Sequence, residues 1–175
     1  RCFYSRNIDN MLMAGRNISA TKIAMSSTRV MGTCSVGGQA AGTAAGLCVQ
    51  YHCLPRELGD KIHVLQQRLI EDDCFIPGVT NDGTRDLARS AVITASSEQP
   101  GREGHNVING HNRNHAGTLN YWESNGISAE GESLDFYLPS TQPVHCVQLV
   151  FDTNLCRSIK ITLSSKRMSQ QLVGV

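Results

Sequence analysis

The chain has 175 residues, a formal net charge of +1 and a charged-residue content of 18%. Lys and Arg are not clustered among aromatic residues, so we expect no nucleic-acid partner. The length accommodates two structural units, and the residue pattern changes at Pro77-Gly78. We therefore expect a first unit over residues 1–77, a linker over 78–85 and a second unit over 86–175.

The first predicted element is a short buried strand, Met11–Ala14, which is apolar without a helical period and stops at Gly15. A loop follows, and the hydroxyl side chains of residues 26–28 can cap a helix that starts near Thr28 and extends to Tyr51. Its interior glycines are Gly32, Gly37, Gly38, Gly42 and Gly46. Each costs roughly 1 kcal/mol relative to alanine, which indicates that another group approaches the backbone closely.

Three stretches of this region carry a resemblance to a known family: residues 10–19 (NMLMAGRNIS), 27–34 (STRVMGTC) and 38–45 (GQAAGTAA). They look like the C-terminal flavin-binding segment of a family of bacterial FAD-dependent oxidoreductases, which residues 55–77 resemble more loosely. The resemblance implies FAD as the cofactor, with the strand-end turn beside it and the N–H groups of the helix start pointing at the pyrimidine end of the isoalloxazine. It implies cofactor contacts at Gly15, Arg16, Asn17, Thr28, Arg29 and Val30.

Each of these contacts has an expected role. Gly15 forms the turn, Arg16 and Asn17 supply polar contacts, and residues 28–30 supply helix N–H groups. A cation at Arg16 would favour a reduced, anionic flavin by charge attraction, although a surface salt bridge is the alternative. Arg29 stands where the helix dipole disfavours a cation, which suggests an anionic partner in the cofactor or substrate, unless the side chain simply extends into water.

The chain contains no GxGxxG motif, so the fingerprint that cradles a dinucleotide pyrophosphate is absent from its sequence. Residues 1–6 look like the tail of the stretch that precedes the final flavin strand in the related enzymes. We therefore expect a C-terminal fragment whose catalytic residues and further FAD contacts lie in an N-terminal part of the same polypeptide. The sequence leaves two alternatives for the compartment, cytoplasmic and exported.

The stretch Val30–Val49 has no charged residue, but its Gly, Thr, Ser and Gln content is too high for membrane insertion. The spacing of Gly38, Gly42 and Gly46 suits a membrane dimer, and close packing of the helix on a sheet explains it equally well. We favour packing on a sheet and expect no transmembrane segment.

The cysteines offer no metal-binding or redox motif. The chain has seven of them, none in a CxxC pair and none with a His at zinc-ligand spacing, so we expect no metal site. Cys34 and Cys48 lie within the predicted helix as small apolar side chains. Cys48 and Cys53 do not have the spacing of a CxxC redox pair.

A second, amphipathic helix is predicted from Leu54 to Asp72-Asp73, with Pro55 in its first turn. Its apolar face contains Leu58, Ile62, Leu65 and Leu69. The paired carboxylates at its end could act as acid and base, but we favour a solvated pair. Residues 80–84 form a turn-rich connector.

From Asp86 onward the pattern changes to short strands, predicted at Ala91–Ser96, Leu134–Leu138, Val144–Phe151 and Ile159–Leu163. They predict an antiparallel sandwich. Residues 93–98, 106–110, 121–124, 132–136 and 147–152 resemble a discoidin-like, galactose-binding-type jelly roll. Asn109 stands where family members often carry Asp, and the loops are mostly polar rather than aromatic. We expect the sandwich to be truncated before its closing strands.

Two features of this second half invite a functional interpretation. The loop histidines His105, His111 and His115 could bind a metal, but their irregular spacing favours solvated side chains. Trp122 could stack on a sugar, but a lone Trp near a strand is more often a core anchor.

Together these patterns predict an α/β fragment of an FAD-binding domain followed by an incomplete all-β sandwich. We expect the C-terminal portion of an FAD-dependent oxidoreductase that acts on a small-molecule substrate, with a sandwich for carbohydrate or interdomain binding. The alternative is a non-catalytic carbohydrate-binding protein in which the sandwich is the working part.

Overall fold

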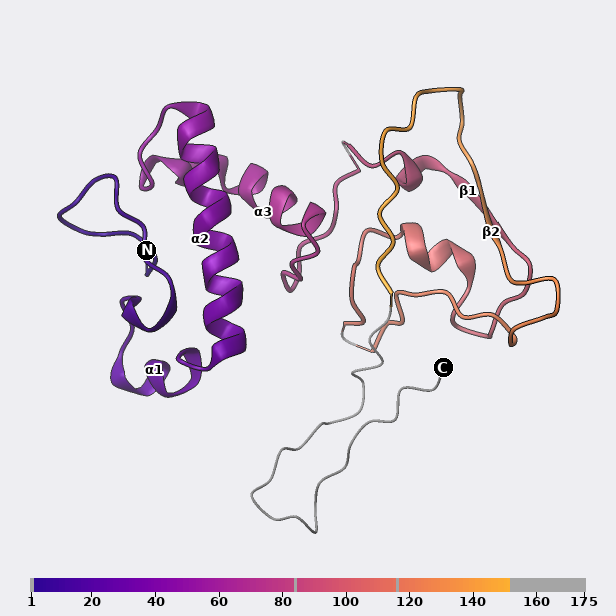
Figure 1. Cartoon of the computed structure of the whole chain (residues 1–175), viewed down its shortest axis with the longest axis horizontal. Coiled ribbons are helices and arrows are strands. Elements are labelled where there is room, and N and C mark those ends of the chain that lie inside the picture. Colours follow the sequence, from indigo (N-terminus) through magenta and orange to yellow (C-terminus); the bar gives the residue numbers. More distant parts are fainter. Residues whose placement is uncertain (1, 84, 116, 152–175) are drawn as a thin grey trace, which may run out of the picture.

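The computed structural model describes residues 2–83, 85–115 and 117–151. In Figure 1 the labelled helices come first in the chain and the labelled strands follow them. The helices are α1 (Lys22–Thr28), α2 (Met31–Tyr51) and α3 (Ile62–Glu71), and the strands are β1 (Val92–Ala95) and β2 (Leu134–Tyr137). Short 3-10 helices lie between them: η1 (Gly15–Asn17), η2 (Glu57–Lys61), η3 (Leu87–Ser90) and η4 (Gly104–Ile108). Across these described ranges, no helix is both long and apolar enough to cross a bilayer.

The predicted strand Met11–Ala14 is extended but pairs only briefly. Tyr4 and Leu12 form an isolated antiparallel bridge. The Ser5 N–H donates to the Met11 carbonyl (3.0 Å) and the Met13 N–H to the Phe3 carbonyl (2.7 Å). The prediction of a full strand is therefore wrong for the described residues, because a strand needs a continuous ladder of such bonds.

The turn after this segment begins at Gly15, whose φ of +84° is the left-handed conformation that glycine adopts without a steric penalty. It opens the 3-10 helix η1. The prediction that Gly15 forms the turn is confirmed.

The predicted start of the long helix is wrong by three residues. Thr28 is the last residue of α1, and α2 begins at Met31 after the extended residue Val30. The reason is an N-cap that the sequence analysis did not weigh: the Thr21 hydroxyl accepts from the Ala24 N–H (3.2 Å) and starts a helix there.

The glycines of α2 do not share one environment. A Cβ built on Gly37 would lie 3.1 Å from the Phe3 ring, so a side chain does approach the backbone there. A Cβ at each of the other four would meet nothing within 4 Å among the described residues. The expectation of close approach is therefore confirmed only at Gly37.

The core of the helical part joins α2 to η2 and α3. Ala44, Leu47 and Leu58 are buried together, and partly buried side chains pack against them: Leu12, Cys48, Cys53, Val64 and Leu65. Of the predicted apolar face of the second helix, Leu69 is also buried, but Ile62 is 51% exposed. The 3-10 segment η2 precedes α3 and has fewer residues per turn, so the helical phase shifts and Ile70 is buried instead.

The second half contains a two-stranded antiparallel sheet in which Val92 pairs with Tyr137 and Ala95 with Leu134. Both strands lie within predicted strands. Within the part of the chain that the structure describes, the predicted strand Val144–Phe151 is wrong, because these residues pair with no described residue and are exposed. The predicted strand Ile159–Leu163 lies outside the described residues. What the structure describes is thus not the sandwich on which the carbohydrate-binding alternative depended.

The predicted linker is held by hydrogen bonds on both sides. The Gln67 side chain donates to the Thr80 carbonyl and accepts from the Asp82 N–H (both 2.9 Å). The Asn81 N–H donates to the Gly110 carbonyl (2.9 Å). The domain boundaries at residues 77 and 86 stay a prediction.

Glu132 joins the loop before β2 to the end of β1 by hydrogen bonds. Its carboxylate accepts from the hydroxyls of Ser96 and Ser97 (both 2.7 Å) and from the Ser128 N–H (3.2 Å). Hydrogen bonds to the charged form favour it, and those from Ser97 and Ser96 lower the pKa of Glu132 from 4.5 to about 2.

This low pKa predicts a pH-dependent stability. A depressed carboxyl pKa contributes stability that is fully present above pH 4.5 and is lost as the pH falls through about 2. We expect Glu132→Gln to be less stable than wild type at neutral pH. The difference in the free energy of unfolding between the two, measured by urea unfolding, should shrink as the pH falls from 4.5 to about 2. Glu130→Gln is the control, since Glu130 makes no hydrogen bond to the described residues, and an equal effect of both substitutions would contradict the prediction.

Candidate active-site groove

A groove of about 440 Å³ lies between the turn at Gly15, the helix α1 and the first half of α2. Its lining is mostly apolar and contains no charged side chain: Cys2, Phe3, Gly15, Ile18, Ser19, Ala20, Thr21, Ala24, Thr28, Thr33, Cys34 and Gly37. The volume falls within the range of small-molecule sites, roughly 300–1,000 Å³. Such a lining suits a flat, largely apolar ring.

The N-terminus of α2 stands beside this groove with free hydrogen-bond donors. The first α2 amide with an acceptor is that of Cys34, which donates to the Val30 carbonyl (3.0 Å). Residues 30–33 find no acceptor for their N–H groups among the described residues, and no side chain caps the helix. Thr33 also lines the groove. A 21-residue helix with a free N-terminus attracts anions and carbonyl oxygens.

Of the six predicted cofactor contacts, Gly15 and Thr28 line the groove, whereas Arg16, Asn17, Arg29 and Val30 do not. The amides at 28 and 29 also differ from the prediction of free helix-start donors. Thr28 closes α1, its hydroxyl donates to the Ala24 carbonyl (3.1 Å), and the Arg29 N–H donates to the Met25 carbonyl (3.2 Å). The free donors are those of residues 30–33, which include only Val30 from the predicted set.

Arg16 and Arg29 are exposed, and no carboxylate within the described ranges forms an ion pair with either. The surface salt bridge considered as the alternative for Arg16 is therefore not formed there. Both cations stay available to an anionic ligand.

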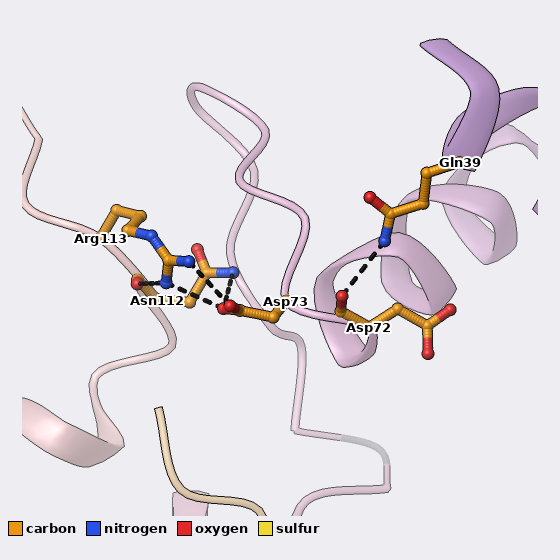
Figure 2. A network of polar contacts seen from close by, with 5 residues as sticks. All are labelled: Gln39, Asp72, Asp73, Asn112 and Arg113. Atoms are coloured by element: carbon orange, nitrogen blue, oxygen red, sulfur yellow. Dashed lines mark hydrogen bonds and ion pairs between the residues drawn. The ribbon is translucent and has the colours of Figure 1, made fainter. Parts of the chain in front are cut away.

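Asp72 and Asp73 lie at a junction of the described chain, Asp72 through its backbone carbonyl and Asp73 through its carboxylate (Figure 2). Gln39 of α2 donates to the Asp72 carbonyl (3.1 Å). Asp73 accepts two bonds from the Arg113 guanidinium (2.8 and 2.7 Å) and one from Asn112 (3.3 Å). Asp72 is exposed, as expected of a solvated pair, but Asp73 joins the end of α3 to the second half of the chain.

The loop histidines His105 and His115 are exposed, as predicted for solvated side chains, whereas His111 and Trp122 are half-buried. His115 lies with its ring centroid 5.6 Å from that of Phe75. In the described part of the chain, no group of three or more His, Cys, Asp or Glu side chains could hold a metal ion. Trp122 is half-buried and donates to the Ser97 carbonyl (2.9 Å), as an anchor would.

The groove and the free helix N-terminus place an apolar surface beside free hydrogen-bond donors, which is the combination that a flat ring with hydrogen-bond acceptors requires. Comparison with known families agrees: residues 1–69 match the family described as FAD dependent oxidoreductase. FAD is the cofactor that this family implies. The match includes the groove, α1, α2 and all but the end of α3, and it supports an FAD-dependent oxidoreductase fragment over these residues. No curated protein and no solved structure matches the chain.

Most of the groove lining, including Phe3, Ile18 and Thr33, was not predicted from the sequence. Thr21, followed by the helix-forming stretch Lys22–Met25, was the available signal, because a capped helix ending at Thr28 moves the free amides to residues 30–33. Phe3 carried no comparable signal, since its contact with Gly37 joins residues 34 positions apart.

Proposed function

We propose that this chain contributes the flavin-contacting extended segment, turn and helices of an FAD-dependent oxidoreductase that acts on a small-molecule substrate. The observation that carries the proposal is the uncharged groove beside the uncapped N-terminus of α2, both within the residues that match the family. Bound FAD supplies two-electron chemistry, accepting electrons from a substrate and passing them to an acceptor.

The chain's own residues bind and orient the ring. The apolar lining, with Phe3 and Ile18, packs against the flat ring system, and the N–H groups of residues 30–33 donate to its carbonyl oxygens. Gly15 keeps the turn open at the groove, and Asn17 offers a polar contact beside it. Arg16 and Arg29 supply positive charge that favours an anionic reduced flavin.

Further polypeptide of the same protein completes the FAD site in this proposal. The chain has no GxGxxG motif for the pyrophosphate. Ile23 and Met31, which lie one and two positions from the groove residues Ala24 and Thr33, are 86% and 88% exposed. In this proposal the further polypeptide covers these apolar side chains.

Filling the groove tests the proposal. Thr33 is exposed, lines the groove and lies in the first turn of α2, where Trp has a helix propensity similar to that of Thr. We expect Thr33→Trp to weaken FAD binding at least ~10-fold, about 1.4 kcal/mol, measured by the quenching of flavin fluorescence on titration. The matched control is Gly42→Ala, a change on the same helix that meets nothing within 4 Å.

The control variant is expected to bind FAD as wild type does. If the full-length wild-type polypeptide, including the part that completes the site, retained no FAD, the flavin assignment itself would be overturned. Equal affinity of wild type and Thr33→Trp would instead show that the flavin binds somewhere other than this groove.

A further inference from the structure

The C-terminal end of α2 brings two cysteines together that are five positions apart in sequence. His52 adopts the left-handed conformation (φ 50°, ψ 44°), and its N–H donates to the Val49 carbonyl (3.3 Å). The Cys53 N–H donates to the Cys48 carbonyl (3.0 Å). These two bonds define a Schellman motif. In this motif the side chains of the two residues joined by the bond that spans more of the sequence, here Cys48 and Cys53, commonly touch.

The side chains of both cysteines lie on the same core. Cys48 and Cys53 each pack against the buried residues Ala44, Leu47 and Leu58. Both side chains are half-buried, so they are accessible to a small reagent. The structure records both as free thiols.

The surroundings of the pair restrain its reactivity. Burial, the Cys53 thiol and the Glu57 carboxylate all raise the pKa of the Cys48 thiol. Glu57 is held in place by the Leu54 N–H, which donates to its carboxylate (2.8 Å). Because the thiolate is the attacking species, a raised pKa slows exchange at neutral pH without preventing it.

We propose that Cys48 and Cys53 form a dithiol that exchanges with small-molecule disulfides and closes to a disulfide across the end of α2. The thiolate of one cysteine attacks a sulfur of oxidised glutathione, which forms a mixed disulfide and releases one glutathione thiolate. The second cysteine then attacks the protein sulfur of that bond and releases the second glutathione. The two protein thiols are oxidised by two electrons, the glutathione disulfide is reduced, and the released thiolates take up the two protons.

Mass spectrometry of the folded full chain tests this proposal. The protein is incubated with oxidised glutathione at mildly alkaline pH, quenched with acid, unfolded, alkylated and digested with trypsin. The peptide Val30–Arg56 contains Cys34, Cys48 and Cys53. We expect it to lose two hydrogens and to carry one alkyl group, on Cys34. Glutathione adducts on the exposed Cys2 and Cys146 show that the oxidant reacted.

Two variants separate the role of the helix end from that of mere proximity in sequence. The register control Cys53→Leu/Leu54→Cys keeps the composition but moves the thiol out of the Schellman position, and we expect closure to slow at least ~10-fold. Glu57→Gln keeps a hydrogen-bond acceptor and removes the charge, so we expect closure to speed up about threefold.

An internal comparison is available at the end of α3. The Cys74 N–H donates to the Leu69 carbonyl (2.8 Å) in the same kind of turn. The residue that Cys74 faces across this turn is a leucine rather than a second cysteine, so we expect Cys74 to form no disulfide and to be fully alkylated. Adducts without closure at Cys48 and Cys53 would overturn the proposal. So would equal closure rates in the folded protein, in guanidinium and in the register control.

Discussion

Replacing Leu47 by alanine is expected to lower the free energy of unfolding by about 2–4 kcal/mol. Leu47 is 4% exposed and forms the centre of the core that joins α2 to η2 and α3, with Ala44 and Leu58. Truncation removes the transfer free energy of three carbons and leaves a cavity that backbone atoms of a helix cannot easily fill. Urea unfolding followed by circular dichroism measures the change.

Val49→Ala is the matched control, because Val49 lies on the same helix but is 76% exposed. Its effect should stay within about 0.5 kcal/mol, as is usual for surface substitutions. Equal losses for the two variants would mean that the face of α2 carrying Leu47 does not hold α3.

This core also positions the candidate site. The groove residues Thr33, Cys34 and Gly37 lie in the first half of α2, and the buried residues Ala44 and Leu47 lie in the second half. Because a helix is a rigid rod over such a length, packing at one end sets the direction of the free N–H groups at the other.

Local patterns predicted the elements whose causes are local. The hydroxyl residues 26–28 ahead of the run that ends at Tyr51 predicted the long helix, and the alternation at Leu134–Leu138 predicted β2. The positive φ at Gly15 followed from a glycine where an apolar run stops. The ends were less predictable, because Thr21 rather than residues 26–28 caps the first helix.

Contacts between distant residues were not predictable from the pattern. The approach of Phe3 to Gly37 and the phase shift that exposes Ile62 both depend on how segments pack. The apolar run Val144–Phe151 reads as a strand, yet none of the described residues pairs with it, and an apolar run becomes a strand only when a neighbour supplies the ladder. For the same reason the groove could be expected at Gly15, but most of its lining could not.

The contact between Asp73 and Arg113 also depends on residues that are far apart in sequence. We expect its loss to lower the free energy of unfolding substantially. Asp73 has φ +62°, a left-handed conformation that Asp tolerates better than most residues. Its carboxylate is held by a two-bond contact with Arg113, which comes from 40 positions along the chain. No local pattern indicates this pairing, although Asp and Arg at those positions are what it requires.

Asp73→Ala is expected to lower the free energy of unfolding by about 2–3 kcal/mol. The substitution removes the charge-assisted pair with Arg113, and it leaves a β-carbon in a left-handed conformation without a compensating side-chain bond. Asp73→Gly should cost less than Asp73→Ala, since glycine adopts that conformation freely. Asp73→Asn should fall between wild type and Asp73→Ala, because it keeps one acceptor and the tolerance for positive φ.

A double-mutant cycle with Arg113→Ala separates the interaction energy of Asp73 and Arg113 from the cost of the left-handed backbone conformation at residue 73. We expect Arg113→Ala alone to cost about 1–2 kcal/mol, the range of hydrogen bonds to charged groups at a half-exposed site. In the Asp73→Ala background the same substitution should cost much less, because the carboxylate that it contacts is gone. Full additivity would show that the pair is not formed in solution.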